Sequence, residues 1–233
     1  MTERIVFLHS ALGDGRTWDR QLRLLGDRFD VLAPDLPGFG DEPVPRDEFS
    51  FVDRVAERLP ATLIGNSVGG GIALRTALAH PEGVPRLVLV DVGVPDHEWS
   101  SGVRDYWRAE EELLERGDVD AAVELTLETW ALPHVREQLR EPVRRSYELQ
   151  AEVPEPSVRW PEPAPLSGLR AQTLVIVGEL DFPDFHAIGE RIVREAPDAR
   201  LEVVPGAGHL PSLEQPDVFD RLLLAFLGAP TAE

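Results

Sequence analysis

The sequence predicts an α/β fold, with a doubly wound, mostly parallel sheet of about six strands covered by helices on both faces. Short apolar runs recur along the 233 residues, and helical segments lie between them. The runs are continuously hydrophobic rather than alternating, which is typical of parallel strands buried on both faces. Parallel strands also need crossover connections, which the helical segments supply. The predicted strands are 5–9, 31–34, 61–66, 86–91, 173–178 and 201–205.

The connecting segments carry the apolar spacing of helices. After the first strand, Trp18, Leu22 and Leu25 recur every three to four residues. The segment after the third strand opens with glycines and continues with a similar pattern, beginning at Ile72. The last segment, 218–227, is predicted to be a helix that covers one end of the sheet.

The succession of strands and helices is interrupted between residues 96 and 165. Helical patterns fill the first part of this stretch, and Pro133 is predicted to start its third helix. The return is too rich in proline for regular structure, with Pro154, Pro156, Pro161, Pro163 and Pro165. We therefore expect a core of residues 1–95 and 166–233, and a helical insertion at 96–165 that forms a lid.

Composition excludes several classes of function. Acidic residues outnumber basic ones by 42 to 23, so the formal net charge is −19, and we expect neither nucleic acid nor an anionic membrane as a partner. No apolar stretch approaches the roughly 20 residues of a membrane span, and the N-terminus lacks the features of a signal peptide. These features predict a cytoplasmic protein. The absence of cysteine excludes disulfides and thiolate nucleophiles.

Ser67 is the candidate nucleophile. The run LIGNSVGGG at 63–71 follows an apolar strand and opens a helical segment, which is the context that the G-x-S-x-G pattern requires. Gly65 and Gly69 leave room for a sharp turn, and the N–H of Val68 at the helix start can stabilise an oxyanion. A glycine-rich helix start selected only for close packing would have the same pattern, so the motif alone does not settle the function.

A serine hydroxyl needs a histidine to take its proton, and position selects His209 among six histidines. His209 lies in a glycine-bounded loop just beyond the last predicted strand, at the carboxyl edge where doubly wound sheets gather their sites. The other five are interpreted as structural: His9, His80, His97, His134 and His186.

The third member of such a site is a carboxylate that orients the histidine. Asp181 ends the run VIVGELD, just past the preceding strand, and Asp184 is the alternative. The chain order Ser67, Asp181, His209 is the order described for one class of serine hydrolases and differs from the orders in the familiar serine proteases.

Five motifs together resemble those of the α/β-hydrolase family, in particular small bacterial carboxylesterases and 3-oxoadipate enol-lactonases. They span nearly the whole chain: HSALGDG from residue 9, DLPGFG at 35–40, GNSVGG at 65–70, GELD at 178–181 and GHLPSLEQP at 208–216. The resemblance implies that the Ala11 N–H is the second oxyanion donor. Ser10 departs from the glycine usual in the family, which bears on the placement of Ala11.

The same resemblance implies catalysis with no metal or organic cofactor. Relatives commonly have two further strands before the one at 5–9, so here the strand at 31–34 is expected to lie at an edge of the sheet. Such an edge needs covering or a partner, and we expect a monomer or a homodimer.

The leading hypothesis for function is hydrolysis of a small, apolar ester or lactone through an acyl-enzyme. Trp99, Tyr106, Trp107 and Trp130 in the predicted lid suit an apolar pocket, but ordinary helix packing explains them equally well. Two alternatives remain: a carbon–carbon bond hydrolase acting on ring-fission dienoates, and a non-catalytic small-molecule receptor that keeps the hydrolase fold.

Overall fold

The computed structural model describes residues 2–229, and its sheet has six strands that are all parallel, in the order β2-β1-β3-β4-β5-β6. The strands are β1 Arg4–Leu8, β2 Asp30–Leu32, β3 Thr62–Asn66, β4 Arg86–Val90, β5 Gln172–Gly178 and β6 Ala199–Val204. All six predicted strands are therefore confirmed. The segment predicted at 31–34 is a short edge strand, as expected.

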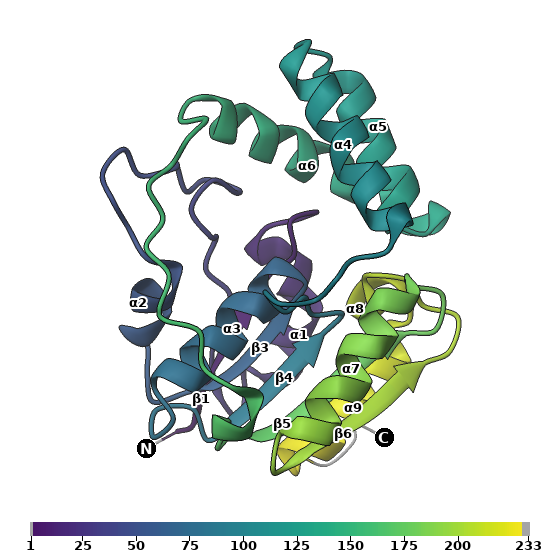
Figure 1. The fold of residues 1–233 in the computed structure, drawn as a ribbon. Coiled ribbons are helices and arrows are strands. Elements are labelled where there is room, and N and C mark those ends of the chain that lie inside the picture. The colour runs from purple at the N-terminus through teal and green to yellow at the C-terminus, as the bar shows by residue number, and fades with distance from the viewer. Residues whose placement is uncertain (1, 230–233) are drawn as a thin grey trace.

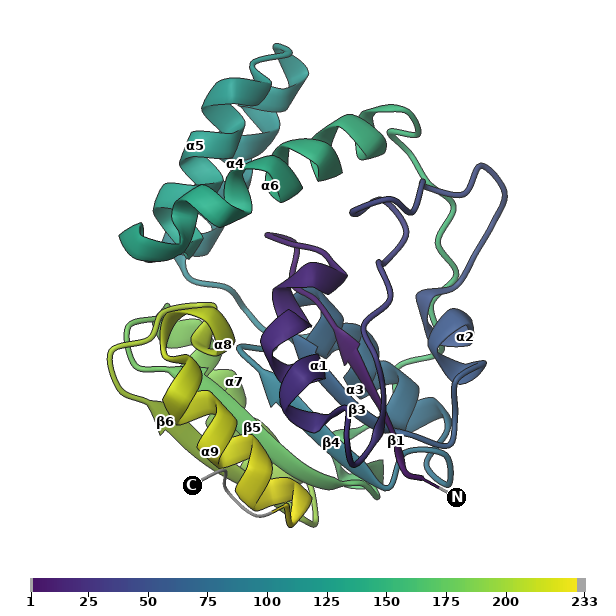
Figure 2. The same cartoon turned by 180° about the vertical axis from the view of Figure 1, so that it is seen from behind.

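Helices cover both faces of the sheet because alternate strand residues face opposite sides and both sets are apolar. On one face, Leu63 and Leu89 pack with α2 Phe51–Ala56, α3 Val68–Ala79 and α7 Pro183–Glu195. On the other, Ile64 and Val88 pack with α1 Asp19–Leu25 and α9 Pro216–Leu227. Figure 1 shows the first face, and Figure 2 shows the second with α1 and α9 in front.

Three long helices connect β4 to β5 and lie above the carboxyl ends of the strands (Figure 1). They are α4 Ser101–Glu115, α5 Val119–Trp130 and α6 Arg136–Ala151. Pro133 begins a short 3-10 helix, η2 Pro133–Val135, that leads into α6, so the helix predicted from this proline starts three residues later. The interpretation of 96–165 as a lid stays a prediction.

Short elements complete the connections: the 3-10 helices η1 Gly15–Trp18 and η3 Leu166–Gly168, and the one-turn helix α8 Pro211–Glu214. Trp18, predicted on the first helix, ends η1 instead, yet it is buried as that prediction required. No helix among the described residues is long and apolar enough to cross a membrane.

Candidate active site

Ser67 lies at the sharp turn between β3 and α3. Its φ of 53° lies in the region that side-chain-bearing residues rarely adopt. A Cβ on Gly65 would lie 2.4 Å from the carbonyl oxygen of Gly69, and a Cβ on Gly69 would lie 2.3 Å from that of Leu8. Because real side chains do not approach backbone this closely, only glycine permits the turn at these two positions. The strained turn sets Ser67 at the carboxyl edge of the sheet.

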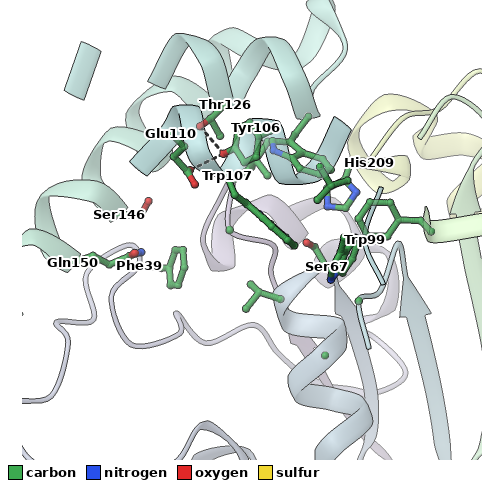
Figure 3. A pocket seen from close by; sticks show the side chains of 18 of the residues that line it. Phe39, Ser67, Trp99, Tyr106, Trp107, Glu110, Thr126, Ser146, Gln150 and His209 are labelled. Atoms are coloured by element: carbon green, nitrogen blue, oxygen red, sulfur yellow. Dashed lines mark hydrogen bonds between the residues drawn. The ribbon is translucent and has the colours of Figure 1, made fainter. Parts of the chain in front are cut away.

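A cavity of about 590 Å³ separates this edge from the three helices above it. Ser67, His209 and Ala11 line it on the side of the sheet. The four aromatic residues singled out from the sequence also line it: Trp99, Tyr106, Trp107 and Trp130. Of these, Trp99 lies beside Ser67 (Figure 3). Figure 3 shows Ser67 and His209 at the same end of this cavity. The aromatic residues therefore contribute to a pocket wall as well as to packing.

His209 and Asp181 form a buried hydrogen bond. Asp181 follows β5 and His209 follows β6, and Nδ1 of the histidine lies 2.7 Å from Oδ2 of the aspartate. When Nδ1 donates this bond, Nε2 carries no proton and is able to accept one. Trp130 and Phe185 hold the imidazole, with ring centroids 4.8 and 4.7 Å from that of His209. The structure thus brings the three predicted residues to one edge of the sheet.

Asp184, the alternative acid, has a different partner. Its Oδ1 accepts from His97 Nε2 at 3.0 Å and from the N–H of Ser100 at 2.7 Å. These bonds attach the start of α4 to the first turn of α7, so the geometry favours Asp181 as the partner of His209. This contact is consistent with the structural role predicted for His97.

His9 organises the loop after β1. It is fully buried, its Nδ1 donates to the carbonyl of Ser10 at 2.8 Å and its Nε2 accepts from the N–H of Leu36 at 2.9 Å. Burial lowers the pKa of His9, which favours this neutral form. The Ser10 hydroxyl accepts from the N–H of Leu12 at 3.2 Å, so the residue that departs from the family's glycine stabilises its own loop.

The predicted oxyanion donors lie on either side of Ser67. Val68 and Ala11 both line the cavity, and Val68 is the first residue of α3, so its N–H has no acceptor within the helix. Their positions suit the predicted role, which stays a prediction.

Two polar residues that the sequence analysis did not assign hold the His209 loop. Asn66 Nδ2 donates to the carbonyls of Val90 at 3.1 Å and of His209 at 3.2 Å. The buried Glu214 accepts from the N–H groups that flank His209 and, through Oε1, from that of Leu132 at 2.9 Å. Both belong to quoted motifs, GNSVGG and GHLPSLEQP, but which contacts they make depends on the fold.

Asp91 is a second unassigned carboxyl, at the end of β4. It is fully buried with a φ of 42°, and its Oδ1 accepts from the N–H of Gly178 at 3.0 Å. Oδ2 makes no hydrogen bond of ordinary geometry within residues 2–229, although Asp181 lies beside it. Burial, and then the negative charge of Asp181, raise the pKa of Asp91 well above its usual value. A neutral Asp91 avoids two adjacent buried charges.

This pKa predicts a specific pH dependence of stability. The folded chain retains a proton on Asp91 that the unfolded chain releases above pH ~4. The contribution of Asp91 to the free energy of unfolding is therefore fully present below that pH and is lost as the pH rises. The slope is about 1.4 kcal/mol per pH unit for one proton. Asp91→Asn should therefore gain stability relative to the wild type as the pH increases from 4.5 to 7.5, as measured by urea unfolding.

Asp105→Asn serves as the matched control, because Asp105 is exposed and its one ion pair within residues 2–229 is with Arg108. Its stability relative to the wild type should change little across the same pH range. A pH-independent difference between Asp91→Asn and the wild type would contradict the assignment.

Asp91, Asp181 and His209 also form the group whose ligand atoms lie closest together, all within 4.8 Å. A metal ion bound by both Asp181 Oδ2 and His209 Nδ1 would require these two atoms to separate, because they already contact each other at hydrogen-bond distance. The geometry therefore fits a carboxylate–histidine pair better than a metal centre.

The parallel sheet, the serine on its strained turn and the histidine–aspartate pair define a hydrolase of the α/β class. The sequence profile of the Alpha/beta hydrolase family matches residues 5–222. The chain belongs to this family, which confirms the resemblance found in its motifs.

Similar proteins include enzymes with different substrates. The chain is 28% identical to a pimeloyl-[acyl-carrier protein] methyl ester esterase of Aeromonas hydrophila over 96% of its own length and 95% of the esterase. It is 32% identical to a 2-hydroxymuconate semialdehyde hydrolase of a Pseudomonas species over 87% of its length and 77% of the relative. Against an uncharacterized Mycobacterium tuberculosis protein it is 34% identical over 98 residues, which span 29% of that protein.

Among solved structures, the enol-lactonase of Burkholderia xenovorans superposes with a TM-score of 0.77 over 98% of this chain and 92% of the lactonase. The two sequences are 22% identical, so this similarity shows the fold alone.

Proposed function

We propose that this protein is a serine hydrolase that cleaves a carboxylic ester or lactone through an acyl-enzyme intermediate. The observation that carries the proposal is the meeting of three groups at one edge of the sheet: the Ser67 hydroxyl on its strained turn, His209, and Asp181 bonded to that histidine at 2.7 Å. The 28% identity to a pimeloyl-[acyl-carrier protein] methyl ester esterase over nearly the whole chain supports an ester as the substrate.

In the proposed reaction, Ser67 Oγ attacks the substrate carbonyl while His209 Nε2 takes its proton. The N–H groups of Val68 and Ala11 stabilise the negative charge on the carbonyl oxygen, and Asp181 stabilises the imidazolium. His209 then gives the proton to the leaving alcohol, and a water molecule activated by the same histidine releases the acid.

Two contacts between the insertion and the site support the role of the insertion as a lid. Trp130 packs on His209 and on Phe185, which joins an insertion helix to the site itself. Glu214 bonds to Leu132, so the His209 loop and the connection before α6 are also linked. The aromatic wall favours a substrate with an apolar portion.

Carbon–carbon bond hydrolysis is the second candidate. It is favoured by the 32% identity to a 2-hydroxymuconate semialdehyde hydrolase, and the same three residues would serve it. The two activities are distinguished by substrate, because a ring-fission dienoate loses its visible absorbance on cleavage.

The test combines a covalent probe with substrates. A fluorophosphonate is expected to add one equivalent to the protein, on the peptide that contains Ser67, and to abolish hydrolysis of 4-nitrophenyl esters in proportion to labelling. Labelling elsewhere, or activity that survives full labelling, would refute the proposal. A kcat/KM for a dienoate above that for every ester and lactone tested would replace it with the second candidate.

A further inference from the structure

Arg75 lies on α3, about two helical turns beyond Ser67. Its side chain folds back toward the serine, because Nη1 donates to the carbonyl of Gly71 at 3.0 Å. A Cβ on Gly71 would itself lie 3.0 Å from Nη1, so the glycine leaves space for the guanidinium. Ser67, Gly71 and Arg75 all line the same cavity. The positive charge is thus held one helical turn, ~5.4 Å along the axis, from the level of Ser67.

The guanidinium of Arg75 has no counter-ion in the described chain. Two other arginines with mostly buried side chains have one: Arg86 pairs with Glu3, and Arg191 with Asp96 at 2.7 Å. Burial alone lowers the pKa of Arg75, whereas Asp96 raises that of Arg191. Arginine nevertheless keeps its charge at neutral pH, and a half-buried charge without a partner costs free energy. The chain has a net charge of −19, yet none of its described carboxylates pairs with Arg75. This indicates that the guanidinium is available to an anion from outside the protein.

Trp160 orients the guanidinium. The Cζ atom of Arg75 lies 4.8 Å from the centroid of the indole ring, which covers one face of the cation. One N–H group of the guanidinium donates to the Gly71 carbonyl, and the others are available to a planar acceptor. A carboxylate suits this role, because it can accept two parallel hydrogen bonds from a guanidinium.

The charge at the other end of the cavity has the opposite sign. Glu110 accepts from the hydroxyls of Tyr106 at 2.6 Å and Tyr147 at 2.5 Å, on the helices above the sheet and away from Ser67 (Figure 3). An anionic substrate group is therefore repelled from Glu110 and attracted to Arg75. Arg75 is the one arginine among the described residues that line this cavity, which fits a singly charged carboxylate better than a phosphate dianion.

We propose that Arg75 binds a carboxylate group on the substrate, so that the enzyme acts on esters or lactones whose acyl or alcohol part carries a carboxylate. This inference rests on the proposed function, which supplies the ester or lactone bond, and adds the substrate class. Binding is non-covalent, and the same carboxylate remains on the product.

The test uses neutral and anionic substrates of matched size. On the acyl side, 4-nitrophenyl hexanoate is compared with 4-nitrophenyl hydrogen adipate; on the alcohol side, 4-methylphenyl acetate is compared with 4-acetoxybenzoate. In at least one pair the wild type should favour the anion. Arg75→Gln should lower that preference about 10- to 100-fold, mainly through KM, since a hydrogen bond to a charged group is lost. Arg75→Lys should retain part of the preference, and the neutral substrates should change little.

Arg108→Gln is the matched control, because Arg108 lies exposed on α4, pairs with Asp105 and does not line the cavity. It should leave the preference unchanged. Equal kcat/KM within both wild-type pairs, or a preference that survives in a folded Arg75→Gln protein, would overturn the inference. Ser67-dependent hydrolysis of the neutral esters would still stand in either case, so the two proposals fail separately.

A second measurement needs no turnover. Calorimetric titration of Ser67→Ala with 4-nitrophenyl hydrogen adipate and with 4-acetoxybenzoate should give, for at least one of them, binding that the added Arg75→Gln substitution weakens by a similar factor. Equal affinities for both ligands in the presence and absence of Arg75 would also overturn the inference, even if no ester is hydrolysed.

Discussion

Replacing Ser67 with alanine is expected to lower kcat for ester hydrolysis by about 10⁵- to 10⁶-fold, which is typical when a nucleophile that acts together with its base is removed. Stability should hardly change, because alanine keeps the Cβ and adopts the same turn. Since the serine and the histidine act as a unit, the double variant Ser67→Ala/His209→Ala should be no slower than Ser67→Ala alone. Both results are read from turnover of 4-nitrophenyl esters, with folding checked by circular dichroism.

Ser146 supplies the matched control. It is a buried serine that lines the same cavity, but its hydroxyl donates to the carbonyl of Val143 in its own helix at 2.8 Å. Ser146→Ala should keep activity within a few fold of the wild type. If Ser67→Ala retained more than a small residual activity, the proposed roles of Ser67 and His209 would be wrong. They would also be wrong if the effects of Ser67→Ala and His209→Ala multiplied in the double variant.

Gly69→Ala is expected to produce a large loss of stability. The new Cβ would lie 2.3 Å from the carbonyl oxygen of Leu8, and this atom belongs to β1, which is paired on both sides, so the backbone of either β1 or α3 must shift. Overpacking against backbone costs at least about 3 kcal/mol here, at the upper end of such substitutions. In a domain of this size the melting temperature should fall by about 6–12 °C. Activity should fall as well, because the shift displaces Ser67.

Gly168→Ala distinguishes this effect from a general intolerance of alanine. A Cβ at Gly168 would have no atom of the described residues within 4 Å beyond its chain neighbours, so the melting temperature should change by no more than about 2 °C. Equal melting temperatures for the two variants would show that the turn at Ser67 relaxes at little cost, and that the glycine is not required for close packing.

The order and type of the core elements could be read from the sequence because their signals are local. A buried parallel strand needs a continuous apolar run, and a nucleophile turn needs glycines two residues before and after the serine. Each requirement is met within a few neighbouring residues, at 86–91 for one strand and at Gly65 and Gly69 for the turn. Asp181 and His209 were found in the same way, from their places just after predicted strands.

Other features depend on contacts between segments far apart in the chain. The sequence favours Asp181 and leaves Asp184 as the alternative acid, and only the packing of α7 against the start of α4 shows that Asp184 pairs with His97. The sequence leaves the role of the aromatic residues of the insertion open for the same reason, since helical spacing does not say whether a tryptophan faces a cavity or a neighbouring helix.

The sequence by itself determined the fold class, the six strands and the residues that belong at the carboxyl edge, because chain connectivity and hydrophobic pattern fix these locally. The tertiary structure alone decided how charge is distributed around that edge. Asp91 lies beside Asp181, and Arg75 reaches the cavity without a counter-ion from residues 2–229, because strands and helices distant in sequence enclose them. Burial and the presence of a neighbouring charge are properties of that enclosure, and no sequence motif encodes them.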